Sequence, residues 1–439
     1  MEVVAKTTFE KYAAYKDSGA KWIGQIPVHW KVEKGKWLFT KNERPVRSED
    51  DVITCFRDGE VTLRSNRRTD GFTNAIKEHG YQGIRKGDLV IHAMDAFAGA
   101  IGVSDSDGKS TPVYSVCTER FENTVNQYYY SYFLRSLALN GVIVSLAKGI
   151  RERSTDFRFN DFGELLLSFP PLQEQTAIAS FLDDKTAKID QAIAQKEKLI
   201  ELLKERKQII IQQAVTKGLD ANVKLKDSGV EWIGEIPEHW EVEPIKYSLK
   251  GVIDCEHKTA PFVDEKEYFV VRTSNVKNGK LTFDNAKYTH QKGFIEWTER
   301  GIPTPGDILL TREAPAGEAC LVPNDIQLCL GQRMVWLKVD KTKLIPQLGI
   351  YFIYSSVGRT YIDFLSAGST VLHFNMADIK NIPIISIPLT EQQEIVTYIE
   401  TQSAKIDKAM SLQQRQIEKL KEYRATLIDS AVTGKIKVS

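Results

Sequence analysis

The sequence predicts an α+β protein: two similar mixed α/β domains separated by a pair of long antiparallel, coiled-coil-like helices, with an internal pseudo-twofold repeat. Two observations lead to this prediction. A Trp-rich motif at residues 22–30 returns at residues 232–240. Two stretches without Gly or Pro, Glu174 to Ala214 and Glu391 to Ala431, also match each other. Since two matched ends enclose a poorly matched middle, we expect a duplicated frame that carries two different inserts.

Each copy of the frame begins with the same Trp-rich turn. It reads Trp-Ile-Gly-Gln-Ile-Pro-Val-His-Trp at 22–30 and Trp-Ile-Gly-Glu-Ile-Pro-Glu-His-Trp at 232–240. Each copy continues into a long helix through Pro-Leu-x-Glu-Gln, which starts at Pro171 and Pro388. The signature Ala-Lys-Ile-Asp follows on both helices. These landmarks predict a first domain at 1–170, a central helix at 171–219, a second domain at 220–387 and a C-terminal helix at 388–439.

The two long stretches are rich in good helix formers, and at ~1.5 Å per residue each would reach about 60 Å. A narrow apolar stripe runs along each one and the other faces are polar, as a two-helix seam requires. The alternative, in which each helix packs only on its own domain, fits this narrow stripe less well. We expect Gly218 and Gly434 to end the helices. The predicted seam consists of Ile178, Leu182, Ile189, Ile193, Ile200, Leu203, Ile210, Ile395, Ile399, Ile406, Met410, Ile417, Leu420 and Leu427.

The inserts share landmarks although their sequences differ. Gly87-Asp88 and Gly306-Asp307 are turns that lead into apolar strands. Tyr132-Phe133-Leu134 and Tyr351-Phe352-Ile353 are typical of the apolar face of a helix. We therefore expect one fold in both inserts.

The divergent parts of the inserts are polar and basic, and Arg and Asn are the side chains that make bidentate contacts to guanine and adenine. A group of charged side chains is more often a solvated surface, so the set carries more weight than any member. The candidate DNA-binding residues of the first insert are Arg57, Arg64, Asn66, Arg67, Arg68, Lys148, Arg151 and Arg153. Those of the second insert are Lys258, Arg272, Ser274, Asn275, Lys277, Arg312 and Arg333.

Composition limits the other function classes. The chain has 59 basic and 58 acidic residues, which does not mark a nucleic-acid binder, although such surfaces are local. Its five cysteines form no CxxC pair or Cys/His cluster, so we expect no metal site and a reduced, cytoplasmic protein. No apolar run approaches the ~20 residues needed to span a bilayer, and no signal peptide is expected.

The Trp-rich turn also has a catalytic interpretation, because it contains His29 and His239. No Cys, Ser or carboxylate recurs with them in a nucleophile or metal arrangement. A turn that docks each domain onto the frame, or onto a partner, explains the duplication better.

The order and duplication of these motifs resemble the DNA specificity subunit of type I restriction-modification systems over nearly the whole chain. The resemblance rests on the Trp-Ile-Gly-x-Ile-Pro-x-His-Trp turn, the Gly-Asp turn, Pro-Leu-x-Glu-Gln and Ala-Lys-Ile-Asp, each present twice. It implies two target recognition domains that each read one half of a split double-stranded DNA sequence. It also implies that the helices set the gap between the half-sites and dock two methyltransferase subunits.

The resemblance further implies a non-catalytic chain that binds no cofactor itself. S-adenosylmethionine, ATP and Mg²⁺ are expected on partner subunits, namely the methyltransferases and the restriction or translocase subunits. The chain has no Walker A run and no Asn/Asp-Pro-Pro-Tyr/Phe motif. Two alternatives stay open: a self-contained modification enzyme with fused recognition domains, and a scaffold whose two domains bind proteins.

Overall fold

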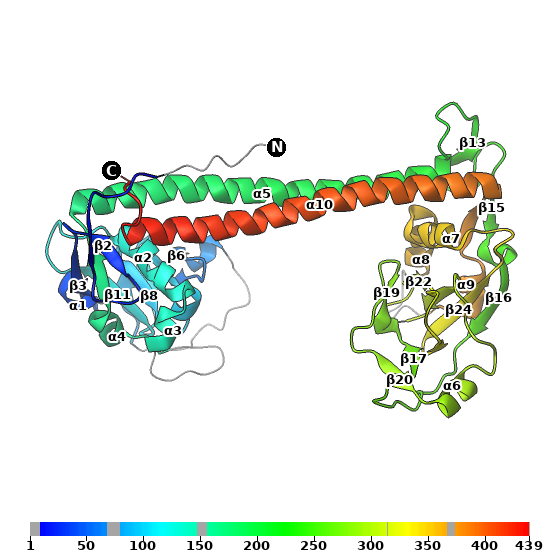
Figure 1. The fold of residues 1–439 in the computed structure, drawn as a ribbon, viewed down its shortest axis with the longest axis horizontal. Coiled ribbons are helices and arrows are strands. Elements are labelled where there is room, and N and C mark those ends of the chain that lie inside the picture. The colour runs from blue at the N-terminus through cyan, green and yellow to red at the C-terminus, as the bar shows by residue number, and fades with distance from the viewer. Residues whose placement is uncertain (1–8, 68–79, 147–155, 314, 367–373, 439) are drawn as a thin grey trace. The chain divides into compact units, whose positions relative to one another are not determined.

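The computed structural model describes residues 9–67, 80–146, 156–313, 315–366 and 374–438. The chain forms two compact units. The first unit comprises Met1–Glu197 and Gln414–Ser439, and the second comprises Lys198–Gln413. Each unit therefore contains one insert together with part of each long helix (Figure 1).

The first unit is built from short strands and helices. Its strands are β1 (Tyr15–Asp17), β2 (Gln25–Pro27), β3 (Lys31–Lys34), β4 (Phe39–Lys41), β5 (Ile53–Cys55), β6 (Val61–Leu63), β7 (Gln82–Ile84), β8 (Leu89–His92), β9 (Ile101–Val103), β10 (Gly108–Ser110), β11 (Tyr114–Glu119) and β12 (Leu166–Phe169). Its shorter helices are α1 (Gly35–Leu38), α2 (Gln127–Leu139), α3 (Val142–Leu146) and α4 (Phe159–Glu164), with 3-10 turns η1 (Arg64–Asn66) and η2 (Ala96–Ala98).

The second unit has a similar series of elements. Its strands are β13 (Leu225–Asp227), β14 (Glu235–Pro237), β15 (Glu241–Pro244), β16 (Leu249–Asp254), β17 (Tyr268–Val271), β18 (Val276–Lys277), β19 (Lys280–Leu281), β20 (Lys287–Thr289), β21 (Ile308–Thr311), β22 (Ala319–Leu321), β23 (Leu328–Leu330), β24 (Met334–Val339) and β25 (Pro383–Ser386). Its shorter helices are α6 (Gln291–Trp297), α7 (Pro346–Tyr354), α8 (Ser356–Ser366) and α9 (Met376–Lys380), with 3-10 turns η3 (Ile245–Ser248) and η4 (Thr273–Asn275).

Both inserts are built on the same antiparallel sheet. The strand order is β4-β11-β8-β9 in the first unit and β16-β24-β21-β22 in the second. The central strands β8 and β21 follow the two Gly-Asp turns, and their apolar side chains are buried, as expected for strands covered on both faces. The second unit adds a three-stranded sheet in which β17 pairs in parallel with β23. The inserts thus share a fold where their sequences diverge.

Helices α2 and α7 occupy matched places beside these sheets. The α2 helix starts at a side-chain cap, because Asn126 accepts hydrogen bonds from the amides of Tyr128 and Tyr129. The α7 helix starts with Pro346, which suits a first turn that needs no amide donor. Apolar side chains on one face of each helix, including Phe133 and Phe352, are fully buried, as the sequence predicted.

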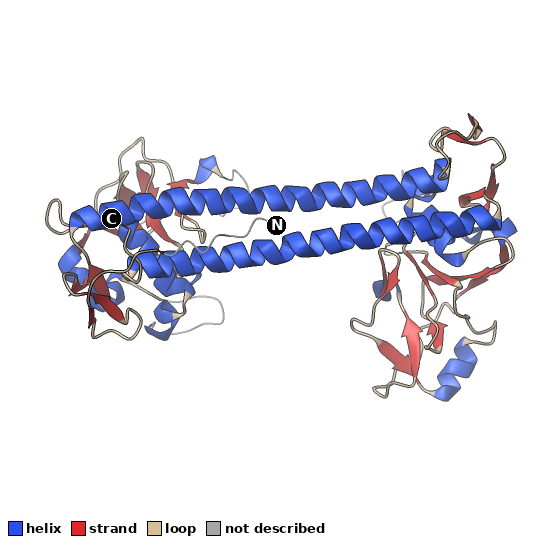
Figure 2. Ribbon diagram, turned by 45° about the horizontal axis from the view of Figure 1, so that its top comes forward, coloured by secondary structure: helices blue, strands red, loops and turns tan. Residues whose placement is uncertain are grey.

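The two longest helices are α5 (Leu172–Lys217) and α10 (Leu389–Val432). Both are followed by the predicted glycines in left-handed conformation, at φ +72° for Gly218 and +73° for Gly434. Figures 1 and 2 show parts of α5 and α10 side by side in each unit. All fourteen predicted seam residues are buried or half-buried.

The pairing is antiparallel. In the first unit, Lys196 donates to the Gln416 side chain at 2.6 Å, whereas Asp190, which precedes Lys196, lies 3.2 Å from Arg424, which follows Gln416. In the second unit, Lys207 binds both carboxylate oxygens of Asp407 at 2.8 Å. Polar residues inside the stripe thus have partners across the seam, and such pairs can fix the register of two helices.

Candidate nucleic-acid interface

The Trp-rich turn is a docking element in both units. In the first unit, the carboxylate of Glu174 accepts a hydrogen bond from the Trp30 indole at 3.0 Å and contacts His29 Nε2 at 2.6 Å. In the second unit, Glu391 accepts from Trp240 at 3.1 Å and contacts His239 at 2.9 Å. The glutamate of Pro-Leu-x-Glu-Gln therefore holds the turn against the start of each long helix. This confirms the docking interpretation of the turn.

The glutamine of the same motif holds the insert. Gln175 accepts from the amide of Asn126 at 2.7 Å and donates to the carbonyl of Pro170 at 2.8 Å. Gln392 accepts from the amide of Ile345 at 2.7 Å and donates to the carbonyl of Ile387 at 2.8 Å. Asn126 and Ile345 directly precede α2 and α7. One Glu-Gln pair thus anchors both the turn and the insert, which explains why the motif occurs twice.

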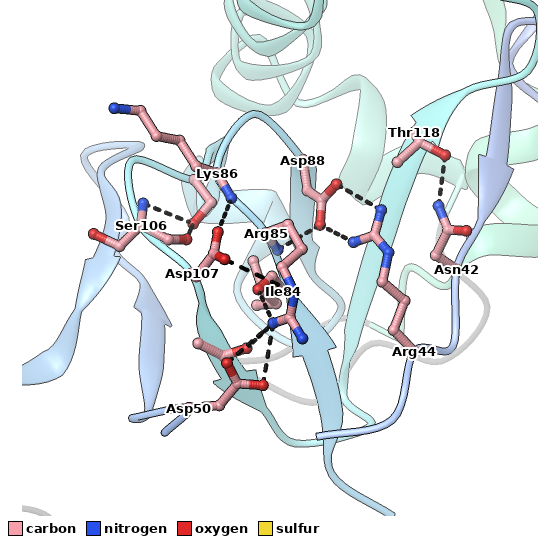
Figure 3. A network of polar contacts seen from close by, with 12 residues as sticks. Asn42, Arg44, Asp50, Ile84, Arg85, Lys86, Asp88, Ser106, Asp107 and Thr118 are labelled. Carbon is pink, nitrogen blue, oxygen red and sulfur yellow. Dashed lines mark hydrogen bonds and ion pairs between the residues drawn. The ribbon is translucent and has the colours of Figure 1, made fainter. Parts of the chain in front are cut away.

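The Gly-Asp turns have a structural role as well. Asp88 accepts from the amide of Arg85 at 2.7 Å and forms an ion pair with Arg44 (Figure 3). Arg85 in turn lies 3.1 Å from the buried carboxylate of Asp50. In the second unit, Asp307 accepts from the amides of Thr304 at 2.9 Å and Val339 at 3.1 Å. These paired groups fix the entry into the central strands.

Four of the candidate DNA-binding residues of the first unit gather on one hairpin. Arg57 lies in the β5–β6 loop, Arg64 and Asn66 lie on η1 just after β6, and Arg67 follows them. The Arg57 side chain is 61% exposed and reaches Asp95 at 2.7 Å. Arg67 lies over the Phe56 ring, 4.1 Å from its centroid, and pairs with Asp58 at 2.7 Å. The hairpin therefore presents several guanidinium groups on one surface.

This surface lies at the end of β8, where the sequence predicted no DNA-binding residue. His92 ends β8, its ring is 4.6 Å from that of Tyr114 at the start of β11, and it lies 3.3 Å from Asp95. Burial lowers the pKa of His92, and Arg57 acts in the same direction, although Asp95 opposes them. The position of His92 in the sequence could have indicated this site. His92 is the last residue of the strand that follows the Gly-Asp turn, as Thr311 is the last residue of β21.

In the second unit the candidates at the matched strand ends are Arg312 and Arg333. Arg312 follows β21 and Arg333 precedes β24, next to the end of β16 at Asp254. The Arg333 side chain is 55% exposed and lies 3.0 Å from Glu313. Its backbone has φ +66°, a left-handed conformation that is uncommon for a residue other than Gly, Asn or Asp. Such a constraint is typical of functional sites.

Two predicted contacts are structural instead. Arg312 is buried, binds Asp254 at 2.7 and 2.9 Å, and donates to the carbonyl of Phe374 at 2.9 Å. Asn275 is fully buried and donates to the carbonyls of Thr282 and Asp284, both at 3.2 Å. Because these polar groups are already satisfied inside the unit, we remove Arg312 and Asn275 from the candidate DNA contacts.

The remaining candidates vary in accessibility. Lys258, Ser274 and Lys277 are exposed. Arg272 is half-buried and donates to the carbonyl of Asn285 at 2.5 Å. Four further predicted residues lie outside the described part of the chain, namely Arg68, Lys148, Arg151 and Arg153.

The described residues contain no group of three or more His, Cys, Asp or Glu side chains placed to hold a metal ion. All five cysteines are buried and free, and burial raises the pKa of Cys320 and of Cys329 to about 12. These thiols are protonated at neutral pH, whereas a nucleophilic cysteine needs a thiolate. Among the same described residues, every helix is too short or too polar to cross a membrane.

Comparison with known proteins agrees with this arrangement. Residues 237–422 match the family described as the type I restriction modification DNA specificity domain. The chain is 26% identical over 431 residues to the putative type I restriction enzyme MjaX specificity subunit of Methanocaldococcus jannaschii, covering 95% of this chain and 96% of that protein. It is 22% identical over 438 residues to the type I restriction enzyme EcoKI specificity subunit of Escherichia coli K12, covering 94% and 90%.

Solved structures show the same fold. One, described as the basis of complex assembly and conformational transition of the type I R-M system, has a TM-score of 0.68 at 15% identity and covers 93% of this chain and 98% of its own. The HsdS subunit of Thermoanaerobacter tengcongensis has a TM-score of 0.56 at 14% identity, covering 94% and 98%.

The duplicated frame, two inserts with one sheet topology and the matched family define a DNA specificity protein. The comparisons support a specificity subunit of a type I restriction-modification system. They support a DNA-recognition subunit of such a complex rather than its catalytic component.

Proposed function

We propose that the two units read two different half-sites of one split double-stranded DNA target. The observation that carries this proposal is the placement of the candidate contacts. Arg57 of the first unit reaches Asp95 just after β8 ends, and the exposed Arg333 of the second unit directly precedes β24, so each unit has an exposed arginine at a matched end of the central sheet. The frame that holds the two inserts is the same, while the exposed residues at these strand ends differ, as two readers of different sequences require.

The long helices, in this proposal, set the gap between the half-sites and dock two methyltransferase subunits. Support comes from the antiparallel seam, whose apolar stripe is interrupted by paired polar groups. Such pairs fix a register and hence a spacing. S-adenosylmethionine, ATP and Mg²⁺ are then bound by the methyltransferase and restriction or translocase subunits. The assembly works in the cytoplasm, where the genome is.

The test is a methylation map. The chain is co-expressed with the methyltransferase subunit encoded beside it, and methylated adenines are located across the genome by single-molecule sequencing. We expect one split motif with a fixed gap. A stable complex that methylates no defined motif would favour a protein-binding scaffold, and methylation by the purified chain with S-adenosylmethionine alone would favour a self-contained enzyme.

A further inference from the structure

In the first unit, an N-terminal segment covers the start of α5 and the Trp-rich turn. The Tyr12 hydroxyl donates to Glu174 Oε2 at 2.8 Å. The Tyr12 ring lies edge-on to Trp30, with centroids 5.8 Å apart. Phe9 lies edge-on to Phe181 of α5 at 5.7 Å. Two aromatic side chains, three residues apart, thus close this face of the first unit.

The matching face of the second unit is a groove. Tyr398 stands where the first copy has Phe181, and Glu391 stands where it has Glu174. A hollow of about 290 Å³ is bordered by His239, Trp240, Glu391 and Glu394. A second hollow of about 350 Å³ is lined by Tyr398 and by residues between Ile210 and Leu225. We call these two adjoining hollows the α10 groove.

The matching glutamates of the two units differ in exposure and in hydrogen bonding. The Glu391 side chain is 36% exposed, compared with 16% for Glu174. Within the part of the chain that the structure describes, hydrogen bonds to the Glu391 carboxylate come from His239 and Trp240. Glu174 has a third donor, the Tyr12 phenol. Tyr398 is 40% exposed.

The linker after α5 does not replace the aromatic segment. Gly218 begins this linker, and Gly434 begins the C-terminal tail after α10. Both glycines have φ near +72° and lie against the indole of Trp240 or Trp30. The linker is therefore the counterpart of the C-terminal tail. The first unit contains an additional segment, the N-terminal one, beside this tail. The amide of Lys437 in the tail donates to the carbonyl of Glu10 in that segment at 2.7 Å.

We propose that the α10 groove binds a segment of the methyltransferase subunit that carries two aromatic side chains three residues apart, the second of them a tyrosine. The phenol donates to Glu391, and the other ring packs edge-on against Tyr398, as Tyr12 and Phe9 do in the first unit. This inference rests on the proposed function, since it assumes assembly with that subunit.

The charges of the groove favour a protein segment over DNA. Three carboxylates line the hollow beside Trp240, from Asp220, Glu391 and Glu394, against the cationic Lys217 and the imidazole of His239. An acidic lining repels phosphates, whereas it accepts hydrogen bonds from phenol groups. Tyrosine also gives a large contact area at a low cost in conformational entropy.

The first experiment is site-specific photocrosslinking in the reconstituted complex. A photoreactive phenylalanine replaces Tyr398 in one preparation of the full chain and Phe181 in another. We expect crosslinks from position 398 to a methyltransferase segment with the stated pattern, identified by mass spectrometry. Position 181 should crosslink within the chain, to the N-terminal segment. Crosslinks from 398 to a second copy of this chain, or to none of the subunits, would overturn the proposal.

A matched pair of variants gives the affinity. Tyr398→Ala should weaken methyltransferase binding by at least about tenfold. The control Tyr247→Ala removes another tyrosine of the second unit, 56% exposed and outside the groove, and should bind like the unmodified chain. Since both side chains are exposed, circular dichroism should show unchanged folding. If the complex forms and the two variants bind the methyltransferase subunit with equal affinity, the groove proposal is refuted. If the unmodified chain does not assemble with that subunit, the proposed function is refuted instead.

Discussion

At the scale of single residues, the frame depends on one carboxylate in each unit. Burial alone would raise the pKa of Glu174, but hydrogen bonds from Trp30, Tyr12 and His29 outweigh it and lower the pKa. The ionised form is therefore the one that the surroundings favour. A charged acceptor of this kind makes stronger hydrogen bonds than a neutral one, which suits a group that joins a turn, a terminal segment and a helix.

The exposed Arg333 gives a first prediction. Arg333→Ala should weaken DNA binding by the assembled complex by about 1–3 kcal/mol if the guanidinium contacts a base. Alanine is strained at a φ of +66° as arginine is, so the substitution leaves the backbone strain unchanged and mainly tests the loss of the side chain. Fluorescence anisotropy with a duplex that contains the target measures the effect, with Arg206→Ala on α5 as the control. Unchanged affinity for Arg333→Ala would exclude it as a DNA contact.

His92 gives a prediction about pH. Its folded-state pKa lies below the ordinary 6.5 because burial disfavours the imidazolium, so between the two values the unfolded chain binds more protons. His92 therefore costs no stability above about pH 6.5 and destabilises the fold as the pH falls below it. His92→Gln should reduce the difference in urea midpoint between pH 7.5 and pH 5.5. The exposed His257→Gln should keep that difference; equal behaviour of both variants would contradict the assignment.

At the residue level, the sequence shows the chemical type of each candidate side chain but not its burial. Arg57 and Arg312 are chemically alike, but one is exposed on a loop and the other is buried against Asp254. Nothing local distinguishes them, because Asp254 is distant in sequence and meets Arg312 only through the β16-β24-β21 pairing. The Glu-Gln pair could be recognised in the sequence because it is repeated. Its hydrogen-bond partners Trp30 and Asn126 could be identified only in the folded structure.

At the scale of elements, the long helices were predictable because their signal is local and periodic. The apolar seam residues recur at spacings of three, four or seven positions along α5, which has 46 residues, and α10, which has 44. The strands are two to six residues long, too short for a period to identify them. The parallel pairing of β17 with β23 joins residues almost sixty positions apart and has no sequence signal. Duplication supplied what periodicity could not, since matched Gly-Asp turns identified β8 and β21.

The seam itself can be tested with two apolar residues on α10. Ile417 is 1% exposed, whereas Leu412 is 47% exposed. Ile417→Ala should lower the free energy of unfolding by about 2–4 kcal/mol, because it removes buried methylenes and leaves a cavity. Leu412→Ala should change it by less than about 0.5 kcal/mol. Urea denaturation followed by circular dichroism compares them, and equal losses would mean that the stripe is not a packed seam.

At the scale of the whole molecule, the proposed function assigns one half-site to each unit, and the units are joined by helices whose length is fixed by residue count. Each residue adds ~1.5 Å and a rotation of a little over a quarter turn, so only insertions of whole turns preserve the facing of the seam. Inserting or deleting matched turns near Ile193 on α5 and Met410 on α10 should therefore change the accepted gap between the half-sites. The bases read in each half should stay the same, because neither insert is altered. Methylation maps of the variant complexes measure both quantities at once. If the gap stayed constant while the variants still assembled and methylated DNA, the spacing would be set by another part of the complex. As a control, an insertion of half a turn should abolish methylation, because it rotates the apolar stripes of α5 and α10 apart.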